Sequence, residues 1–347
     1  MILQEPLPTS PKDPSERTFG TQQDDQEVYN ALSEMMDEGQ HGIRWSCRDF
    51  TDDPHGLLRI DKAFIPILDQ GVHAQKAARD WAPFLIPQDD LVELQKGIGS
   101  VYDRSDVSTH LANGGTLVFL LTPHLTYADL PVCMGAAALV SPKIAQNQTG
   151  FIHRQVVLEE LRGEPDENGQ IAKLKVVDDG LMLIGNTIQT LPDSKSGRDD
   201  RLADSREAIN GAVQRAIDDL LELGGQTLWL AGSGTETKFD PVTGKNVVGL
   251  ISRNNARLLY MYNARRSNKV MTVPLSIQID PFTSEGGFNP HLVPFSFGEP
   301  KFLHSKDEAR ELMEREISTA NSLVQSGTPP FRNETPEEFI TRVGKRP

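Results

Sequence analysis

Hydrophobic residues follow two different patterns along the chain, one before and one after Gly114. Before it, apolar residues recur with the spacing of one helix face in several stretches, and this spacing predicts helices. These stretches are 26–36, 57–68, 74–81 and 91–101. After it, Thr116–Leu121 is a continuous apolar run between Gly-Gly and Thr-Pro, which is typical of a strand buried on both faces of a parallel sheet. We therefore predict a helical N-terminal domain at 23–113 and an α/β domain at 114–330.

The second region alternates between strand-like and helix-like segments. Further strands are predicted at 181–184, 227–231 and 270–279, helices at 129–139, 204–221, 252–263 and 306–323, and loops at 162–175 and 232–244. The helix at 204–221 has the clearest signals, because Asp204 and Glu207 are spaced as a capping box and Gly224 and Gly225 follow its apolar stripe. Repeated strand–helix–strand units indicate an α/β fold with a mixed, mostly parallel sheet flanked by helices.

The composition limits the classes of protein to which the chain can belong. Its 347 residues include Lys+Arg 35 and Asp+Glu 49, giving a net charge of −14, and 37% are hydrophobic, which is typical of a soluble globular protein with one large or two unequal domains. The acidic balance argues against nucleic acid as a partner. The most apolar stretch, 116–138, is interrupted by polar residues and prolines, well short of the roughly 18 unbroken apolar residues of a membrane span. We expect a protein that touches a bilayer at most peripherally.

Both ends of the chain are polar. Residues 1–22 have neither the basic and apolar regions of a signal peptide nor the composition of a transit peptide, so we expect a disordered leader there and a polar tail at 331–347. The only cysteines, Cys47 and Cys133, are too few for a disulfide framework or a cysteine-based zinc site, and favour a reducing cytoplasm. Neither a His pair at helical spacing nor a carboxylate cluster predicts a metal site, and we expect no cofactor.

Two predicted strand ends carry residues suited to chemistry. His124 follows the first strand and Asp129 begins the next helix, so a short loop can fold the carboxylate onto one imidazole nitrogen and leave the other to take a proton from a hydroxyl. This is the His–Asp half of a catalytic triad without a serine, so the attacking oxygen would come from the substrate. Segment 231–238 follows another strand, and its small residues and backbone N–H groups can cradle an anion.

Each signal alone also has a purely structural interpretation. Asp129 could simply cap its helix beside a buried histidine whose hydrogen bonds are satisfied, and Gly-Ser-Gly at 232–234 could be an ordinary turn. Their joint placement favours a site, because the carboxyl ends of the strands in such sheets are where reactive groups gather.

Three blocks of sequence occur in an order that matches a known family. They are HLTYAD at 124–129, GGQTLWLA at 224–231 followed by SG at 233–234 and DPVTG at 240–244, and VPLS at 273–276. In these blocks the stretch from about 115 to 279 resembles the glycerolipid acyltransferases with a His-x4-Asp motif, in particular the soluble glycerol-3-phosphate 1-acyltransferases of chloroplasts.

The resemblance implies a reaction and the roles of two residues. His124 would be the general base that deprotonates the acceptor hydroxyl, and Asp129 would orient it and stabilise the imidazolium. The acceptor, the sn-1 hydroxyl of glycerol 3-phosphate, would attack an acyl thioester of coenzyme A or of acyl carrier protein without an acyl-enzyme. Backbone donors near the motif would stabilise the oxyanion.

The phosphate-binding residues depart from the family pattern. The family loop supplies two arginines where this chain has Glu236 and Lys238, so one cation has become an anion and bidentate recognition there is lost. The family's Lys-His pair falls at 194–196, where Lys195 is present and the histidine is missing. The expected substrate-binding residues are Lys195, Arg198, Ser233, Gly234, Thr235 and Lys238.

Two alternatives to acylation of glycerol 3-phosphate stay open. One is acyl transfer to a different hydroxyl acceptor, since the acid–base pair is retained while the phosphate loop is changed. The other is a non-catalytic member that binds acyl chains or carrier protein, against which the intact His124 and Asp129 count. The basic cluster within 253–269 could dock an acidic carrier protein or anionic lipid headgroups, although a solvated helix face explains it equally well.

Overall fold

The computed structural model of the chain describes parts of the α/β region and parts of the helical region before it. The described residues are 74–76, 78, 79, 82, 86–124, 129–153, 186–190, 214, 217–234, 238–240, 245–249, 251–266, 268–278 and 294–325. The predicted helices at 26–36 and 57–68, the strand at 181–184, the loop at 162–175, the leader and the tail lie outside these residues.

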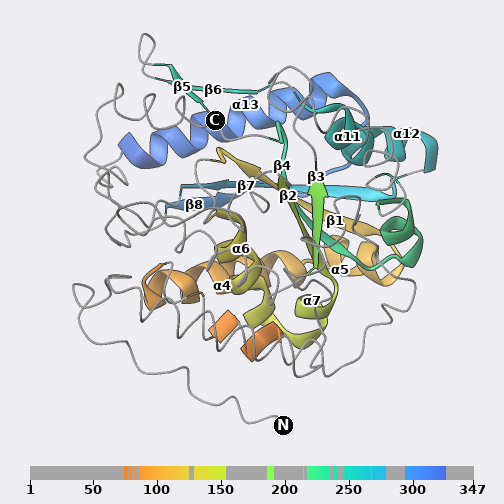
Figure 1. Cartoon of the computed structure of the whole chain (residues 1–347), viewed down its shortest axis with the longest axis horizontal. Coiled ribbons are helices and arrows are strands. Elements are labelled where there is room, and N and C mark those ends of the chain that lie inside the picture. Colours follow the sequence, from red (N-terminus) through yellow and green to blue (C-terminus); the bar gives the residue numbers. More distant parts are fainter. Residues whose placement is uncertain are drawn as a thin grey trace, which may run out of the picture.

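A six-stranded sheet forms the centre of the fold (Figure 1). Its order is β3 (Asn186–Thr190), β2 (Gln148–His153), β4 (Thr227–Ala231), β1 (Thr116–Thr122), β7 (Val270–Ile277) and β8 (Phe295–Phe297). All neighbouring pairs are parallel except β7 and β8, which are antiparallel. The predicted α/β class with a mixed, mostly parallel sheet is confirmed.

Strand β1 lies at the middle of the sheet and is buried along its whole length. Leu117, Phe119 and Leu121 pack into one hydrophobic cluster, and Val118 and Leu120 pack into the other. Because side chains alternate between the two faces of a strand, a continuous apolar run is the pattern that a strand covered on both faces requires, as predicted for this segment.

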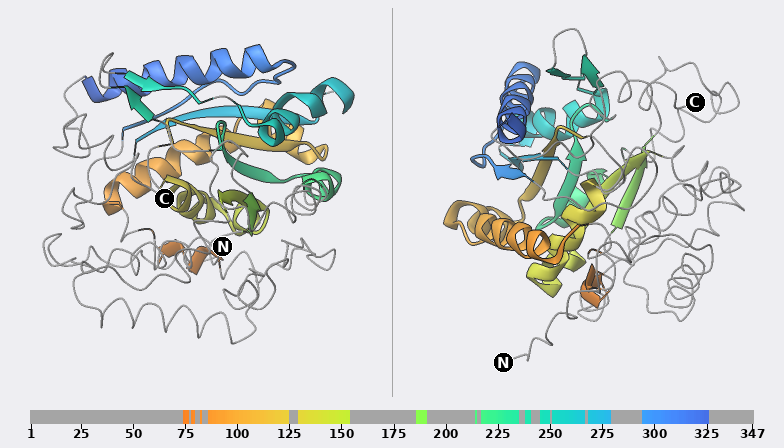
Figure 2. Two further views of the ribbon diagram at one scale, coloured as in Figure 1. Left: turned by 45° about the horizontal axis from the view of Figure 1, so that its top comes forward. Right: turned by 90° about the vertical axis from the view of Figure 1, so that its left-hand side faces the viewer.

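Helices cover both faces of the sheet (Figures 1 and 2). One face carries α4 (Gln88–Tyr102), α5 (Ser105–Ala112), α6 (Asp129–Val140) and α7 (Pro142–Gln146). The other carries the helical residues 217–223, α11 (Arg253–Ala256), the π-helical turn η5 (Arg257–Met261), α12 (Tyr262–Arg266) and α13 (Lys306–Gln325). These elements confirm the predicted helices near 91–101, 129–139, 252–263 and 306–323. The residues of the predicted helices at 74–81 and 204–221 that the structure describes are also helical.

One predicted loop is wrong in part. Within 232–244, β5 (Lys238–Asp240) pairs antiparallel with β6 (Lys245–Val247) to form a small separate sheet. Strands this short show no alternation of apolar and polar residues. The glycines, the proline and the polar residues of this stretch therefore indicated a loop. Strand β7 ends at Ile277, before the predicted boundary at 279.

The helices before Gly114 share a core with the sheet. Buried residues of α4, such as Leu94 and Ile98, belong to the same hydrophobic cluster as Phe119 of β1 and the apolar residues of α6. Gln95 Nε2 of α4 also donates a hydrogen bond to the Leu139 carbonyl of α6, at 2.9 Å. In the described part of the chain, α4 and the sheet therefore share one hydrophobic cluster, and the division of the chain at Gly114 stays a prediction.

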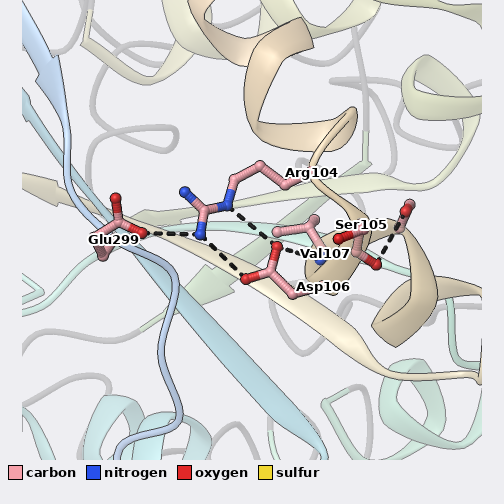
Figure 3. A network of polar contacts seen from close by, with 6 residues as sticks. Arg104, Ser105, Asp106, Val107 and Glu299 are labelled. Atoms are coloured by element: carbon pink, nitrogen blue, oxygen red, sulfur yellow. Dashed lines mark hydrogen bonds and ion pairs between the residues drawn. The ribbon is translucent and has the colours of Figure 1, made fainter.

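An exposed ion-pair network marks the start of α5 (Figure 3). The guanidinium of Arg104 donates to both carboxylate oxygens of Asp106 at 3.2 Å and to Glu299 Oε2 at 2.8 Å. Asp106 Oδ1 in turn accepts the backbone N–H of Val107, in the first turn of the helix. The network ties α5 to the segment after β8, and water and salt screen it because both carboxylates are largely exposed.

Backbone segments meet closely at the amino ends of the strands. Gly224 and Gly225, with φ of 68° and 65°, end the helix before β4, as predicted. A Cβ at Gly224 would lie 2.7 Å from the Gly114 carbonyl oxygen, and that oxygen also accepts a hydrogen bond from Lys269 Nζ. Gly225 N donates to the Gly115 carbonyl at 2.9 Å. The junction has no room for a side chain at Gly224.

Candidate functional site

The two predicted strand ends leave the sheet side by side. Strands β1 and β4 are parallel neighbours, and Leu121 pairs with Ala231. His124 and the turn Gly232–Gly234 therefore follow adjacent strands at the same carboxyl edge. This edge is where binding and catalytic groups gather in open parallel sheets.

His124 and Asp129 form a hydrogen-bonded pair. Nδ1 of His124 lies 3.1 Å from Oδ2 of Asp129. The imidazole is 19% exposed and the carboxylate is 0% exposed. A carboxylate only accepts hydrogen bonds, so it selects the tautomer that carries the proton on Nδ1 and makes Nε2 the basic nitrogen. The pair has the geometry that a general base and its orienting carboxylate require.

Local structure holds each partner of this pair. The histidine follows the end of β1, where the peptide between Thr122 and Pro123 is cis. Asp129 is the first residue of α6, where a negative charge interacts favourably with the helix dipole. From Asp129 to Leu139, every residue of α6 is buried. Its close packing on β2, where a Cβ at Gly150 would lie 2.7 Å from Met134 Sδ, fixes the helix that carries the carboxylate.

Cys133 lies in the same helix as Asp129 and is fully buried. Burial, and then the nearby charge of Asp129, raise the pKa of its thiol well above the ordinary value. A thiol in this environment stays protonated, whereas a nucleophilic cysteine must be a thiolate. Cys133 is therefore part of the core.

The turn Gly232–Gly234 is closely packed on its inner side. Gly234 has a φ of 68° and donates its N–H to the Ala231 carbonyl at 2.9 Å. A Cβ at Gly232 would lie 2.5 Å from Met313 Sδ of α13. A Cβ at Gly249 would likewise lie 2.5 Å from that of Ser233. Gly232 lets α13 approach the turn closely, and Gly249 does the same for its own segment. Gly234 itself is exposed.

Two residues at this edge were missed by the sequence analysis. Asn255 of α11 is buried, and its Nδ2 donates to the carbonyls of Ala231 and Gly232. Glu316 of α13 is also buried, and Ser276 Oγ donates to its Oε2 at 3.0 Å. The sequence contains a weak signal for Glu316, because it is the one acidic residue among the residues that form the buried face of α13. That face consists of Ala309, Leu312, Met313, Glu316, Ile317 and Ala320.

Not all predicted site residues belong to the described part of the chain. His124, Asp129, Ser233 and Gly234 are described, and the structure brings them to one edge of the sheet. The backbone of Lys238 lies in β5. Lys195, Arg198, Thr235 and Glu236 lie outside the described residues, so the cations expected at the phosphate stay predictions from sequence.

The predicted basic cluster consists of Arg253, Arg257, Arg265, Arg266 and Lys269. It lies on α11, η5, α12 and the short segment before β7, and it partly interacts within the fold. Arg257 pairs with Asp218 at 3.9 Å. The guanidinium carbons of Arg257 and Arg266 both lie 5.9 Å from the ring centre of Tyr262. Burial and a hydrogen bond to Asp218 raise the pKa of Tyr262 to about 12. Docking of an acidic partner or a lipid surface on this cluster stays a prediction.

Among the described residues, no group of three or more His, Cys, Asp and Glu side chains could hold a metal ion. No helix within the same residues combines the length and apolar character needed to span a bilayer. The chain matches no protein-family profile and no curated protein.

Proposed function

We propose that this protein is an O-acyltransferase that moves a fatty acyl group from an acyl thioester to the sn-1 hydroxyl of glycerol 3-phosphate. The observation that carries the proposal is the hydrogen bond between His124 and the buried carboxylate of Asp129, next to the turn Gly232–Gly234. The resemblance of the three sequence blocks to the His-x4-Asp acyltransferases supports it. We assign the reaction to the cytoplasm, in solution or at a membrane surface.

The proposed reaction proceeds in one displacement without an acyl-enzyme. Nε2 of His124 takes the proton of the acceptor hydroxyl, while Asp129 accepts the Nδ1–H and stabilises the imidazolium. The acceptor oxygen attacks the thioester carbonyl carbon and forms a tetrahedral oxyanion, which backbone N–H groups beside the motif stabilise. When the carbon–sulfur bond breaks, the imidazolium returns its proton to the departing thiolate. The products are an ester and a free thiol.

In this proposal the acceptor is recognised by the segment that follows β4 and by cations from the segment around Lys195. We assign the phosphate to the turn Gly232–Gly234, with Thr235 and the cations Lys195, Arg198 and Lys238 around it. Glu236 favours a second candidate acceptor, because a carboxylate beside a phosphate is repulsive unless a cation pairs with it. That candidate is another hydroxyl compound, acylated by the same His–Asp pair.

The proposal is tested by measuring thiol release. Purified protein is given palmitoyl-coenzyme A or an acyl carrier protein donor, with and without glycerol 3-phosphate, and the His124→Ala variant serves as the blank. Release that depends on the acceptor and is lost in the variant supports the proposal. Release that requires a different hydroxyl compound supports the second candidate. A protein that releases no thiol with any acceptor would overturn the assignment as an enzyme.

A further inference from the structure

Two buried polar side chains lie at the carboxyl edge of the sheet. Thr122 is the last residue of β1 and is 2% exposed, and Gln278 directly follows β7 and is 6% exposed. In the part of the chain that the structure describes, neither Oγ1 of Thr122 nor Nε2 of Gln278 has a hydrogen-bond partner. A buried polar group without a partner destabilises a fold. A ligand that supplies the missing partner would explain why both side chains are polar.

Thr122 and Gln278 lie on the same face of the sheet. Thr122 pairs with Ser276 of β7, and Ser276 faces α13, because its Oγ donates to Oε2 of Glu316 at 3.0 Å. The N–H of Gln278 donates to the Pro294 carbonyl at 3.3 Å, so the extended backbone of β7 continues to this residue. Since side chains two positions apart share a face of a strand, Gln278 faces the same side as Ser276. The residues two and four positions before Thr122 belong to the hydrophobic cluster of that side as well.

The spacing of these two residues lets both side chains reach one atom. Neighbouring strands lie about 4.8 Å apart, and two residues advance a strand by about 6.6 Å. Thr122 and Gln278 are therefore diagonal neighbours about 8 Å apart, a distance that long side chains such as glutamine can span. The hydroxyl of Thr122 can donate or accept, whereas the amide nitrogen of Gln278 only donates. The missing partner that both can bind is therefore a hydrogen-bond acceptor.

An acceptor atom at this position would lie beside the proposed general base. His124 is two residues after Thr122 in the chain. The charge of Glu316 on this face is balanced, because its Oε1 accepts from the guanidinium of Arg315 at 3.2 Å and its Oε2 accepts from Ser276. In a buried site, hydrogen bonds to a developing negative charge are stronger than in water.

We propose that Thr122 and Gln278 are catalytic residues that donate hydrogen bonds to the carbonyl oxygen of the acyl thioester. The inference rests on the proposed function, because it assigns that carbonyl to the place beside His124. As the acceptor oxygen bonds to the carbonyl carbon, one electron pair of the C=O double bond moves onto the carbonyl oxygen. Both donors keep their protons and stabilise the charge. The pair returns when the carbon–sulfur bond breaks, so the role does not depend on which hydroxyl compound is acylated.

The first test removes the hydroxyl of Thr122 without changing the size of the side chain. Thr272→Val is the matched control for Thr122→Val, because Thr272 faces the same side of β7, near its amino end, and its buried hydroxyl likewise has no partner within the described residues. Both variants should keep or raise the melting temperature, since each loses an unpartnered buried group. Only Thr122→Val should lower kcat for thiol release, by about 10²-fold. Thr122→Ser retains the hydroxyl and should keep kcat within about threefold of the wild type.

The second test compares two buried glutamines. Gln148, at the start of β2, donates from Nε2 to the Met134 carbonyl at 2.9 Å and accepts from Trp229 Nε1 at 3.1 Å. Gln148→Met breaks both bonds, so it should lower the melting temperature and leave kcat near that of the wild type. Gln278→Met breaks no such bond of Nε2, so it should keep the melting temperature while kcat falls about 10²-fold.

A purely structural role for Gln278 predicts the opposite result, a loss of stability with kcat unchanged. A value of kcat within about threefold of the wild type in Thr122→Val or in Gln278→Met would overturn the role of that donor. The same holds if the matched control lowers kcat as much as the variant at the carboxyl edge.

These measurements also separate the inference from the proposed function. A wild-type protein that acylates glycerol 3-phosphate, with kcat unchanged in Thr122→Val and Gln278→Met, overturns the inference alone. A wild-type protein that acylates only a different hydroxyl compound, with kcat lowered in these two variants and not in the controls, supports the inference and overturns the proposed acceptor. A wild-type protein that releases no thiol with any acceptor overturns both.

Discussion

The carboxylate of Asp129 is 0% exposed while the imidazole that it contacts at 3.1 Å, that of His124, is 19% exposed. The acid partner is therefore shielded from solvent inside the fold, and the basic partner lies partly at the surface where a substrate can reach it. Because the carboxylate belongs to a buried helix, the direction of the imidazole is set before any substrate binds. Preorganisation of this kind lowers the cost of aligning a general base.

Substituting the histidine tests whether the pair is catalytic. His124→Ala should lower the rate of acceptor-dependent thiol release by about 10²–10⁴-fold, which is the usual contribution of general-base catalysis. The fold should be retained, because the side chain is partly exposed and follows the end of its strand. Circular dichroism and the melting temperature check the fold. A variant that keeps most of the wild-type rate would rule out this mechanism.

Substituting the aspartate separates its charge from its shape. Asp129→Asn is nearly isosteric, but it removes the charge that stabilises the imidazolium and can favour the wrong tautomer of His124. We expect kcat to fall by about 10²-fold or more, with a smaller change in the KM of either substrate. Steady-state kinetics with each substrate varied in turn measure this. An unchanged kcat would mean that Asp129 serves only as a helix cap.

The buried cysteine gives a readout that needs no substrate. In a Cys47→Ser background, Cys133 should not react with a thiol-specific reagent in the native state and should react fully after unfolding. Burial is the main cause of its raised pKa and the charge of Asp129 is the second, so the thiol should stay unreactive when Asp129→Asn is added. Rapid modification of the native protein would show that the core around α6 opens readily.

The phosphate assignment is tested at two lysines. Lys195→Ala and Lys238→Ala should each raise the KM for glycerol 3-phosphate about tenfold or more, because a hydrogen bond to a charged group contributes about 1.5–3 kcal/mol. The KM for the acyl donor should change less. If neither variant alters the acceptor dependence, the phosphate is bound elsewhere.

The stability of the fold should decrease on the acid side through His110. Burial, and then the positive charge of Lys269, lower the pKa of His110 below its ordinary value of 6.5. The unfolded chain then takes up a proton at a higher pH than the folded one, so the free energy of unfolding falls as the pH drops below 6.5 toward the lowered value. Denaturant unfolding across this range measures the slope.

The matched variants are His110→Gln and His304→Gln. The imidazole of His110 is partly buried and contacts the Thr116 carbonyl at 3.1 Å, whereas His304 is exposed. The first substitution should flatten the dependence on pH and the second should leave it unchanged. The assignment fails if both variants keep the wild-type slope.

The parts of the structure that sequence predicted well depend on local patterns. Strand β1 is a continuous apolar run, and α6 begins at the aspartate that was expected to open it. The contact between His124 and Asp129 spans only a short loop, so it too could be expected from spacing. Local constraints of this kind leave few alternatives for the chain.

The features that were missed depend on contacts between distant segments. Asn255 meets the carbonyls of β4 across more than twenty positions, and Ser276 meets Glu316 across forty. In neither pair does the sequence around one residue indicate which distant residue it contacts. The β5–β6 hairpin was missed for a different reason, because its strands are too short to show a period. Such contacts depend on which distant segments the folded sheet brings together.

The contact between Gly224 and the Gly114 carbonyl has a consequence for anyone who wishes to redesign this protein. Since a side chain at Gly224 would collide with backbone, libraries of variants that include this junction would consist mainly of chains that do not fold. At the other end of the strands, a Cβ at Gly232 would meet the side chain of Met313 rather than backbone, and Gly234 is exposed but has a φ of 68°. Redesign should therefore keep the glycine junction constant and, at the opposite edge, vary exposed positions other than the glycines of the turn Gly232–Gly234.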